Sequence, residues 1–141
     1  MKACCGFGHR NICENISNRI DSVLGESIQQ GCEMLYTGDN KLFSSAVRKI
    51  KKTYPYIKLV CVKPYFTQEL NENKSYYESM YDDVIIPTEI IGVHFKAAIQ
   101  VRNQWMIDHS DTVLIYMIRN QGGAYKAKKY AEKQKKHIVP I

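Results

Sequence analysis

The sequence lacks any apolar run of the roughly 20 residues that a membrane-spanning helix needs. It also lacks a stretch rich in proline, glycine and serine that would mark a linker between domains. The N-terminal residues have no extended apolar segment of the kind that directs secretion. We therefore expect one domain over residues 1–141, with no membrane association and no export.

The sequence also lacks a cysteine pattern that would indicate disulfides or a metal site. The five cysteines are odd in number and contain no CxxC spacing, so they give no support for a disulfide framework or a zinc site. Most of them fall inside predicted strands or helices, where free thiols behave as small buried apolar groups. This usage is typical of a reducing compartment, and we expect a cytoplasmic protein.

Positive charge is in moderate excess. The net charge is +6 at pH 7, and much of it comes from residues 48–52 and 126–136. Such runs usually form a solvated helix face, and attraction of a polyanion or a phosphate ligand is the alternative interpretation.

Strand-like and helix-like segments alternate along the whole chain. The β-rich or alternating patterns predict strands at residues 2–6, 33–37, 57–62, 83–86, 112–118 and 137–141. Amphipathic spacing predicts helices at residues 12–31, 40–52, 95–106 and 124–135. Residues 67–80 contain either a further helix or a mobile loop. Because helices that connect parallel strands require crossovers, we predict a Rossmann-like, doubly wound α/β fold, with a mostly parallel sheet of about six strands and helices on both faces.

Ligands of such sheets bind beyond the carboxyl ends of the strands, and the unusual loop residues fall at that edge. The predicted contacts in these loops are Gly8, His9, Arg10, Thr37, Gly38, Asp39, Gly122, Gly123, Ala124 and Tyr125. The first loop lacks the third glycine of a dinucleotide fingerprint, so we interpret it as a turn that presents His9 and Arg10 to an anion. A simple tight turn is the alternative there, and helix capping alone is the alternative for the second loop.

The diglycine at Gly122 and Gly123 carries the clearest anion-binding prediction. It opens a helix directly after an apolar strand, where backbone N–H groups have no intrahelical partners and glycine lets a phosphate approach them. On the preceding helix, Arg102 lies three residues before Trp105, near the face that packs on the sheet. A cation there needs an anionic partner, either a structural carboxylate or a bound phosphate, and Asn103 is predicted beside it.

Four segments, taken together, resemble the SLOG superfamily and, within it, small bacterial and phage SLOG proteins of unassigned function. These segments are Gly8-His9-Arg10, Arg102-Asn103-x-Trp105-Met106, Ser110-Asp111 and Gly122-Gly123-Ala124-Tyr125. The match spans nearly the whole chain. The resemblance implies a Rossmann-like fold that binds a nucleotide or a nucleotide-derived ligand, and it implies no particular reaction.

The sequence departs from the phosphoribohydrolases of that superfamily. Those enzymes pair an arginine, which Arg102 resembles, with a glutamate beyond the diglycine loop. Lys128 and Lys129 stand where the acidic residues belong, and Ser44 stands where related proteins have an aspartate. N-glycosidic cleavage needs a carboxylate, and lysine does not replace it at neutral pH.

We therefore expect a sensor or carrier that binds a nucleotide-like small molecule without catalysis. The sequence identifies no catalytic residue, no metal ligand and no cofactor, and it is compatible with a homo-oligomer. One alternative is a nucleotide-processing hydrolase whose carboxylate comes from Asp39, Asp82 or Asp83. The other, with nucleic acid as the less favoured partner, is a single-stranded nucleic-acid binder that stacks bases on tyrosines, namely Tyr76, Tyr77, Tyr125 and Tyr130.

Overall fold

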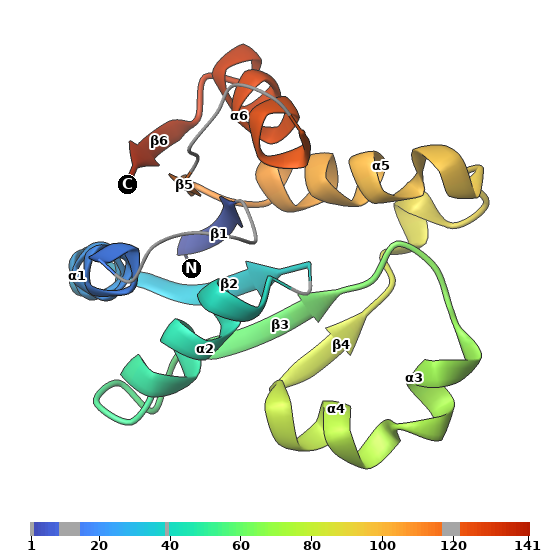
Figure 1. The fold of residues 1–141 in the computed structure, drawn as a ribbon, viewed down its shortest axis with the longest axis horizontal. Helices are drawn as coiled ribbons and strands as arrows, with labels where there is room; N and C mark the ends of the chain where they lie inside the picture. The colour runs from blue at the N-terminus through green and yellow to red at the C-terminus, as the bar shows by residue number, and fades with distance from the viewer. Residues whose placement is uncertain (1, 9–14, 39, 117–121) are drawn as a thin grey trace.

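The computed structural model describes residues 2–8, 15–38, 40–116 and 122–141. These residues form a six-stranded parallel sheet with the order β4-β3-β2-β1-β5-β6 (Figure 1). The strands are β1 (Lys2–Gly8), β2 (Cys32–Thr37), β3 (Lys58–Val62), β4 (Asp83–Ile85), β5 (Thr112–Tyr116) and β6 (His137–Pro140). The predicted Rossmann-like α/β fold with a parallel sheet is confirmed.

Helices follow most of the strands, as the crossovers require. They are α1 (Asn15–Gln29), α2 (Lys41–Ile50), α3 (Gln68–Glu72), α4 (Lys74–Met80), the 3-10 turn η1 (Thr88–Ile90), α5 (Phe95–Asp108) and α6 (Gly123–Lys133). The open question at residues 67–80 is resolved in favour of helix, with α3 and α4 as two short pieces. Within the described ranges, no helix combines the length and apolar character that crossing a membrane would take.

Two apolar layers separate on the two faces of the sheet because successive strand residues point to opposite sides. Cys4 and Leu114 pack with α1 and α2, whereas Cys5 and Val113 pack with α5 and α6. Both faces are therefore covered by helices, as Figure 1 shows. The buried cysteines, Cys4, Cys5, Cys32 and Cys61, are free thiols as expected, and Cys13 lies outside the described residues.

The amino edge of the sheet is held by the Ser110-Asp111 pair. The Ala3 N–H donates to Asp111 Oδ2 at 2.9 Å, and the Asp111 N–H donates to the Ala3 carbonyl at 2.8 Å. Ser110 Oγ donates to the Met106 carbonyl at 2.7 Å, which closes the end of α5. This segment therefore fixes β1 beside β5 and lies at the edge opposite the predicted ligand loops.

The switch point of the fold lies between β1 and β5. From β1 the chain builds outward through β2, β3 and β4 in one direction, and β5 and β6 extend the other side. Gly8 and Tyr116 are register partners at the carboxyl ends of these two strands. In open parallel sheets this is where neighbouring loops diverge and leave a crevice for ligands.

Candidate functional site

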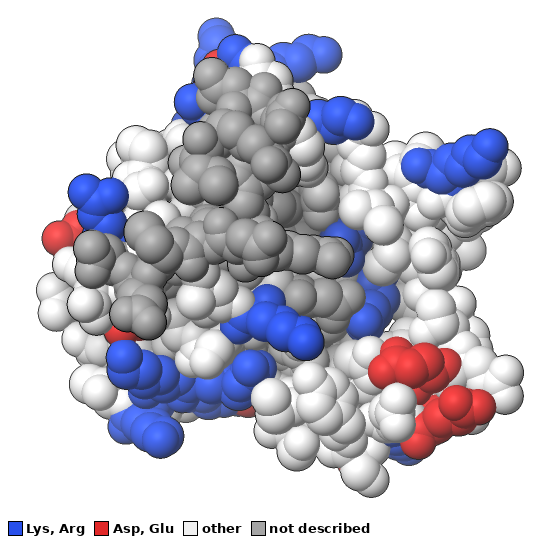
Figure 2. Space-filling view, in the orientation of Figure 1, with Lys and Arg blue, Asp and Glu red and all other residues white. Residues whose placement is uncertain are grey.

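The predicted ligand contacts gather at the carboxyl edge of the sheet, from β2 across to the start of α6. His9, Arg10 and Asp39 lie outside the described residues, so their places in the site stay predictions. Gly8 ends β1, Thr37 ends β2 and Gly38 directly follows it, and Gly122 precedes the first residue of α6. Lysine and arginine side chains predominate on the face shown in Figure 2, and acidic side chains gather mainly near α3.

Arg102 reaches from α5 over the carboxyl ends of β2 and β3. Its Nη1 donates to the Val62 carbonyl at 3.0 Å, and its Nε donates to Asn103 Oδ1 at 2.9 Å. The side chain is buried, with 7% of the residue exposed. Its guanidinium lies so close to Gly38 that a Cβ there would come within 2.6 Å of Cζ. The structure thus fixes a buried cation directly beside the second predicted loop.

Glycines at the strand ends make room for large side chains. A Cβ at Gly8 would overlap the Tyr116 ring, and a Cβ at Gly6 would overlap the Phe43 ring. Neither glycine has the left-handed backbone conformation that only glycine adopts easily. Packing alone therefore accounts for both residues, and a ligand contact by Gly8 stays a prediction.

The second loop is anchored by a buried pair of hydroxyls. Thr37 Oγ1 and Ser44 Oγ are 2.9 Å apart, and both residues are almost fully enclosed. Asn40 caps α2, because its Oδ1 accepts a hydrogen bond from the Phe43 N–H at 3.1 Å. Ser44, at the position where related proteins have an acid, thus ties β2 to the first turns of α2.

The two glycines at the start of α6 differ in backbone conformation and in surroundings. Gly122 has φ 87°, a left-handed conformation that favours glycine. Gly123 has an ordinary backbone, and a Cβ placed on it would meet no atom of the described residues within 4 Å. Among the described residues, no side chain caps this helix and its first turn contains no acidic residue. The described residues therefore provide no side-chain cap for the first N–H groups of α6.

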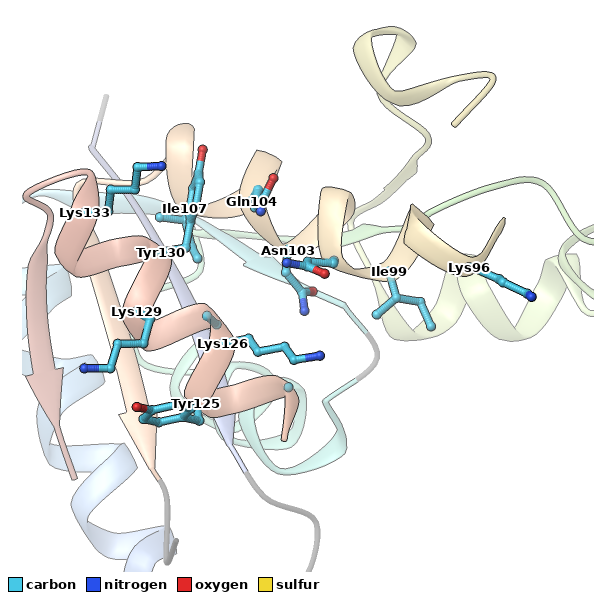
Figure 3. Close-up of a pocket in the computed structure, with 13 residues that line it drawn as sticks. Lys96, Ile99, Asn103, Gln104, Ile107, Tyr125, Lys126, Lys129, Tyr130 and Lys133 are labelled. Atoms are coloured by element: carbon cyan, nitrogen blue, oxygen red, sulfur yellow. The ribbon is translucent and has the colours of Figure 1, made fainter. Parts of the chain in front are cut away.

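A groove of about 500 Å³ runs between α5 and α6 and begins at this helix start (Figure 3). Three of the predicted contacts, Asn103, Gly123 and Tyr125, line it together. Its cationic lining residues are Lys96, Lys126, Lys129 and Lys133. None of the described residues that line it is acidic, so the groove attracts anions.

Tyr116 was not predicted as a site residue. Its hydroxyl is buried at the carboxyl end of β5, and among the described residues it has no hydrogen-bond partner. Burial raises the pKa of Tyr116 well above its usual range, and the nearby Asn40 side chain and Phe43 backbone oppose this only in part. A buried polar residue at the end of an apolar strand was the only available sequence signal.

Two of the three carboxylates considered for a hydrolase, Asp82 and Asp83, lie away from this edge, and the third, Asp39, lies outside the described residues. Asp82 precedes β4, where its Oδ2 accepts from the Leu59 N–H at 2.8 Å and its Oδ1 pairs with Lys51. Burial favours the neutral acid, but these two partners outweigh it and lower the pKa of Asp82. Asp83 is exposed at the start of β4 and accepts from the Val84 N–H. Neither carboxylate lies beside the α6 start.

Comparison with known protein families identifies the family of this chain. The family model YpsA, described as the YspA SLOG family, matches residues 8–141. The chain belongs to the YspA SLOG family. The SLOG resemblance seen in the four sequence segments is thereby confirmed. None of the curated proteins is a match for this SLOG chain.

A solved structure shares the SLOG fold described above. The chain is similar to DNA processing protein A from Helicobacter pylori, with a TM-score of 0.67 and 16% sequence identity. The similarity covers 99% of this chain and 64% of that one, so this SLOG chain spans less than two thirds of its length. That protein was described for its single-stranded DNA binding mode. At this level of identity the similarity establishes the fold alone.

Proposed function

We propose that this SLOG protein binds a nucleotide or a nucleotide-derived ligand at the carboxyl edge of its sheet. In this proposal it acts as a sensor or carrier and does not transform the ligand. The observation that carries the proposal is Gly123 at the start of α6, a glycine that neither its backbone conformation nor its packing against the described residues requires. A phosphate that contacts the N–H groups there would explain the glycine, because a side chain at this position would hinder the approach of the phosphate.

Charge on the neighbouring elements supports an anionic ligand. Lys126 is exposed and lines the groove that begins at Gly123. Arg102 lies over the ends of β2 and β3, where its Nη1 donates to the Val62 carbonyl and its Nε donates to Asn103 Oδ1. The ligand would thus contact backbone N–H donors at the start of α6 and the Arg102 guanidinium above the ends of β2 and β3.

The proposed lack of catalysis rests on the placement of the acids. Lysines occupy positions 128 and 129, where the phosphoribohydrolases have acidic residues, and Asp82 is engaged by Leu59 and Lys51. A carboxylate is needed at the scissile bond to stabilise an oxocarbenium-like centre or to activate water. Among the described residues, none is placed to do so at the start of α6.

Calorimetric titration of the wild type and of Gly123→Val with AMP and ADP tests the proposal. A side chain at this position has free space, so the variant should keep its far-ultraviolet circular dichroism and its melting temperature near wild type. It should lose nucleotide binding because the branched side chain blocks the approach to the N–H groups. Unchanged affinity in Gly123→Val would refute the assignment of this loop.

Binding of single-stranded nucleic acid is a second candidate function, favoured by the lysine-lined groove between α5 and α6. Tyr125 lies in that groove, with Lys129 Nζ 5.4 Å from its ring centroid. The structural neighbour's association with single-stranded DNA points the same way. Titration with a fluorescent oligothymidylate at physiological salt distinguishes the candidates, because submicromolar binding would favour nucleic acid over the small ligand.

A further inference from the structure

A second pocket, with a volume of about 560 Å³, lies between the start of α2 and the α3–α4 segment. Lys41, at the start of α2, and Lys63, which directly follows β3, line it together with Glu69 of α3 and the neighbouring Asn73. The rest of the lining is aromatic, from Tyr76 and Tyr77 of α4 and the following Tyr81. The residues at the start of α6 do not line this pocket. It lies at the same carboxyl edge of the sheet as the proposed site, beside β3, which is two strands from β1.

Tyr77 forms a fixed wall of this pocket. Its hydroxyl donates to Glu69 Oε2 at 2.6 Å, and its ring stacks on Tyr81 with 6.1 Å between centroids and an interplanar angle of 23°. Lys63 Nζ lies 4.9 Å from the centroid of the Tyr77 ring. Burial is the main cause that raises the pKa of Tyr77, so its hydroxyl stays a neutral donor. The ring is held by contacts on several sides at once.

Tyr76 has an exposed ring that packs against the ring of Tyr77. The residue is 51% exposed, and its ring meets Tyr77 edge to face, with 5.4 Å between centroids and an angle of 82°. An aromatic ring that is already held by a neighbour loses little freedom when a second ring stacks on it. The pocket lining holds two lysines, Lys41 and Lys63, and one acid, Glu69, and this net positive charge favours a flat ligand that also carries negative charge.

The spacing of the strands relates this pocket to the start of α6. Strands β3 and β5 are separated by β2 and β1, so their carboxyl ends lie roughly 14 Å apart at the usual distance between neighbours. Arg102 lies between these points, over the ends of β2 and β3. A ligand that reaches from one to the other must be elongated, with phosphate at one end and a planar ring at the other.

We propose that the pocket between α2 and α4 is the base subsite of a nucleoside diphosphate. The base stacks on Tyr76, Arg102 contacts the middle of the ligand, and the terminal phosphate binds at the start of α6. This inference rests on the proposed nucleotide binding and adds to it where the base lies and how long the ligand is.

The test compares ADP, GDP, CDP and UDP with inorganic pyrophosphate, titrated into wild type, Tyr76→Ala and Tyr76→Phe. Stacking on an aromatic side chain typically changes affinity roughly 5- to 150-fold per base, so Tyr76→Ala should weaken the tightest diphosphate by about 10-fold or more. Pyrophosphate binding should stay unchanged, and Tyr76→Phe should keep the wild-type affinity. Tyr56→Ala is the matched control, because Tyr56 is 54% exposed and also meets a tyrosine, Tyr54, edge to face.

Each outcome decides a different point. If Tyr76→Ala weakens neither ligand, or weakens both equally, the base subsite is wrong, while the proposed function stands as long as Gly123→Val still abolishes binding. If the wild type binds neither pyrophosphate nor any of the four nucleotides, the proposed function fails and the base subsite fails with it. A loss of nucleotide affinity in Tyr56→Ala would show that the effect is not local to the pocket.

Discussion

Replacing Gly38 by alanine should move the guanidinium of Arg102. A Cβ at Gly38 would lie 2.6 Å from Arg102 Cζ, 2.8 Å from Nε and 2.9 Å from Nη1, all closer than real Cβ contacts allow. The backbone of Gly38 is not left-handed, so the added methyl group acts through this contact alone. We expect the guanidinium to shift and to weaken its hydrogen bonds to Val62 and Asn103.

The magnitude follows from what Arg102 would lose. A buried hydrogen bond from a charged donor contributes about 1.5–3 kcal/mol, so we expect Gly38→Ala to lower the free energy of unfolding by about 2 kcal/mol. For a chain of this size that corresponds to a melting temperature lower by roughly 4–8 °C. Nucleotide affinity should fall as well, because the cation no longer lies at the carboxyl edge.

Gly25→Ala is the matched control for this experiment. Gly25 lies inside α1, where a Cβ would meet only Ile50 Cδ1 at an ordinary 3.7 Å. Alanine in a helix interior is favoured over glycine by about 0.5–1 kcal/mol, so this variant should be more stable than wild type. Thermal and urea denaturation of both variants measures the difference. A melting temperature for Gly38→Ala equal to that of wild type would show that Arg102 is not held as described.

Four further outcomes are expected. Gly122→Ala should cost about 1 kcal/mol of stability because of its left-handed backbone, whereas Gly123→Ala should cost none, and equal urea midpoints would contradict this. Chromatography of AMP incubated with the protein should detect no free adenine, and release at roughly 1 per second or faster would establish a hydrolase. Lys129→Ala and Lys133→Ala should leave ADP affinity intact in calorimetry, because Lys126 is the only one of the three α6 lysines lining the groove that belongs to the first turn of α6; a matched loss in both would extend the site along the groove. The lowered pKa of Asp82 contributes stability that is present above the ordinary aspartate pKa and is lost as the pH falls below it, so Asp82→Asn should flatten the acid limb of the stability curve.

The sequence predicts most of the architecture because burial of one face of a helix or strand places apolar residues at regular spacings along the chain. β5 is recognisable as an apolar run after Asp111, and α1 as isoleucines and leucines at helical spacing that end before Gly31. The start of α6 at Gly123 was also predictable, since a diglycine after a buried strand has few other uses. These features depend on near neighbours in the chain.

Contacts between distant segments were not predictable in the same way. Gly38 looks like part of a capping turn, and nothing in its surroundings indicates that a guanidinium from α5 lies against it. The wall formed by Tyr77 depends on Glu69, Lys63 and Tyr81 meeting from different segments, which a helical pattern does not encode. The sequence thus predicts the edge at which we propose the site, but not the packing of distant segments at that edge.

The glycines at the strand ends also limit how this protein can change over evolutionary time. Three glycines each leave room for one large side chain that a Cβ would overlap. The pairs are Gly6 with Phe43, Gly8 with Tyr116 and Gly38 with Arg102. A larger residue on the glycine side is tolerated only if its partner shrinks in the same lineage. Among homologues these three pairs should therefore vary jointly or not at all, even though the members of each pair are far apart in the chain.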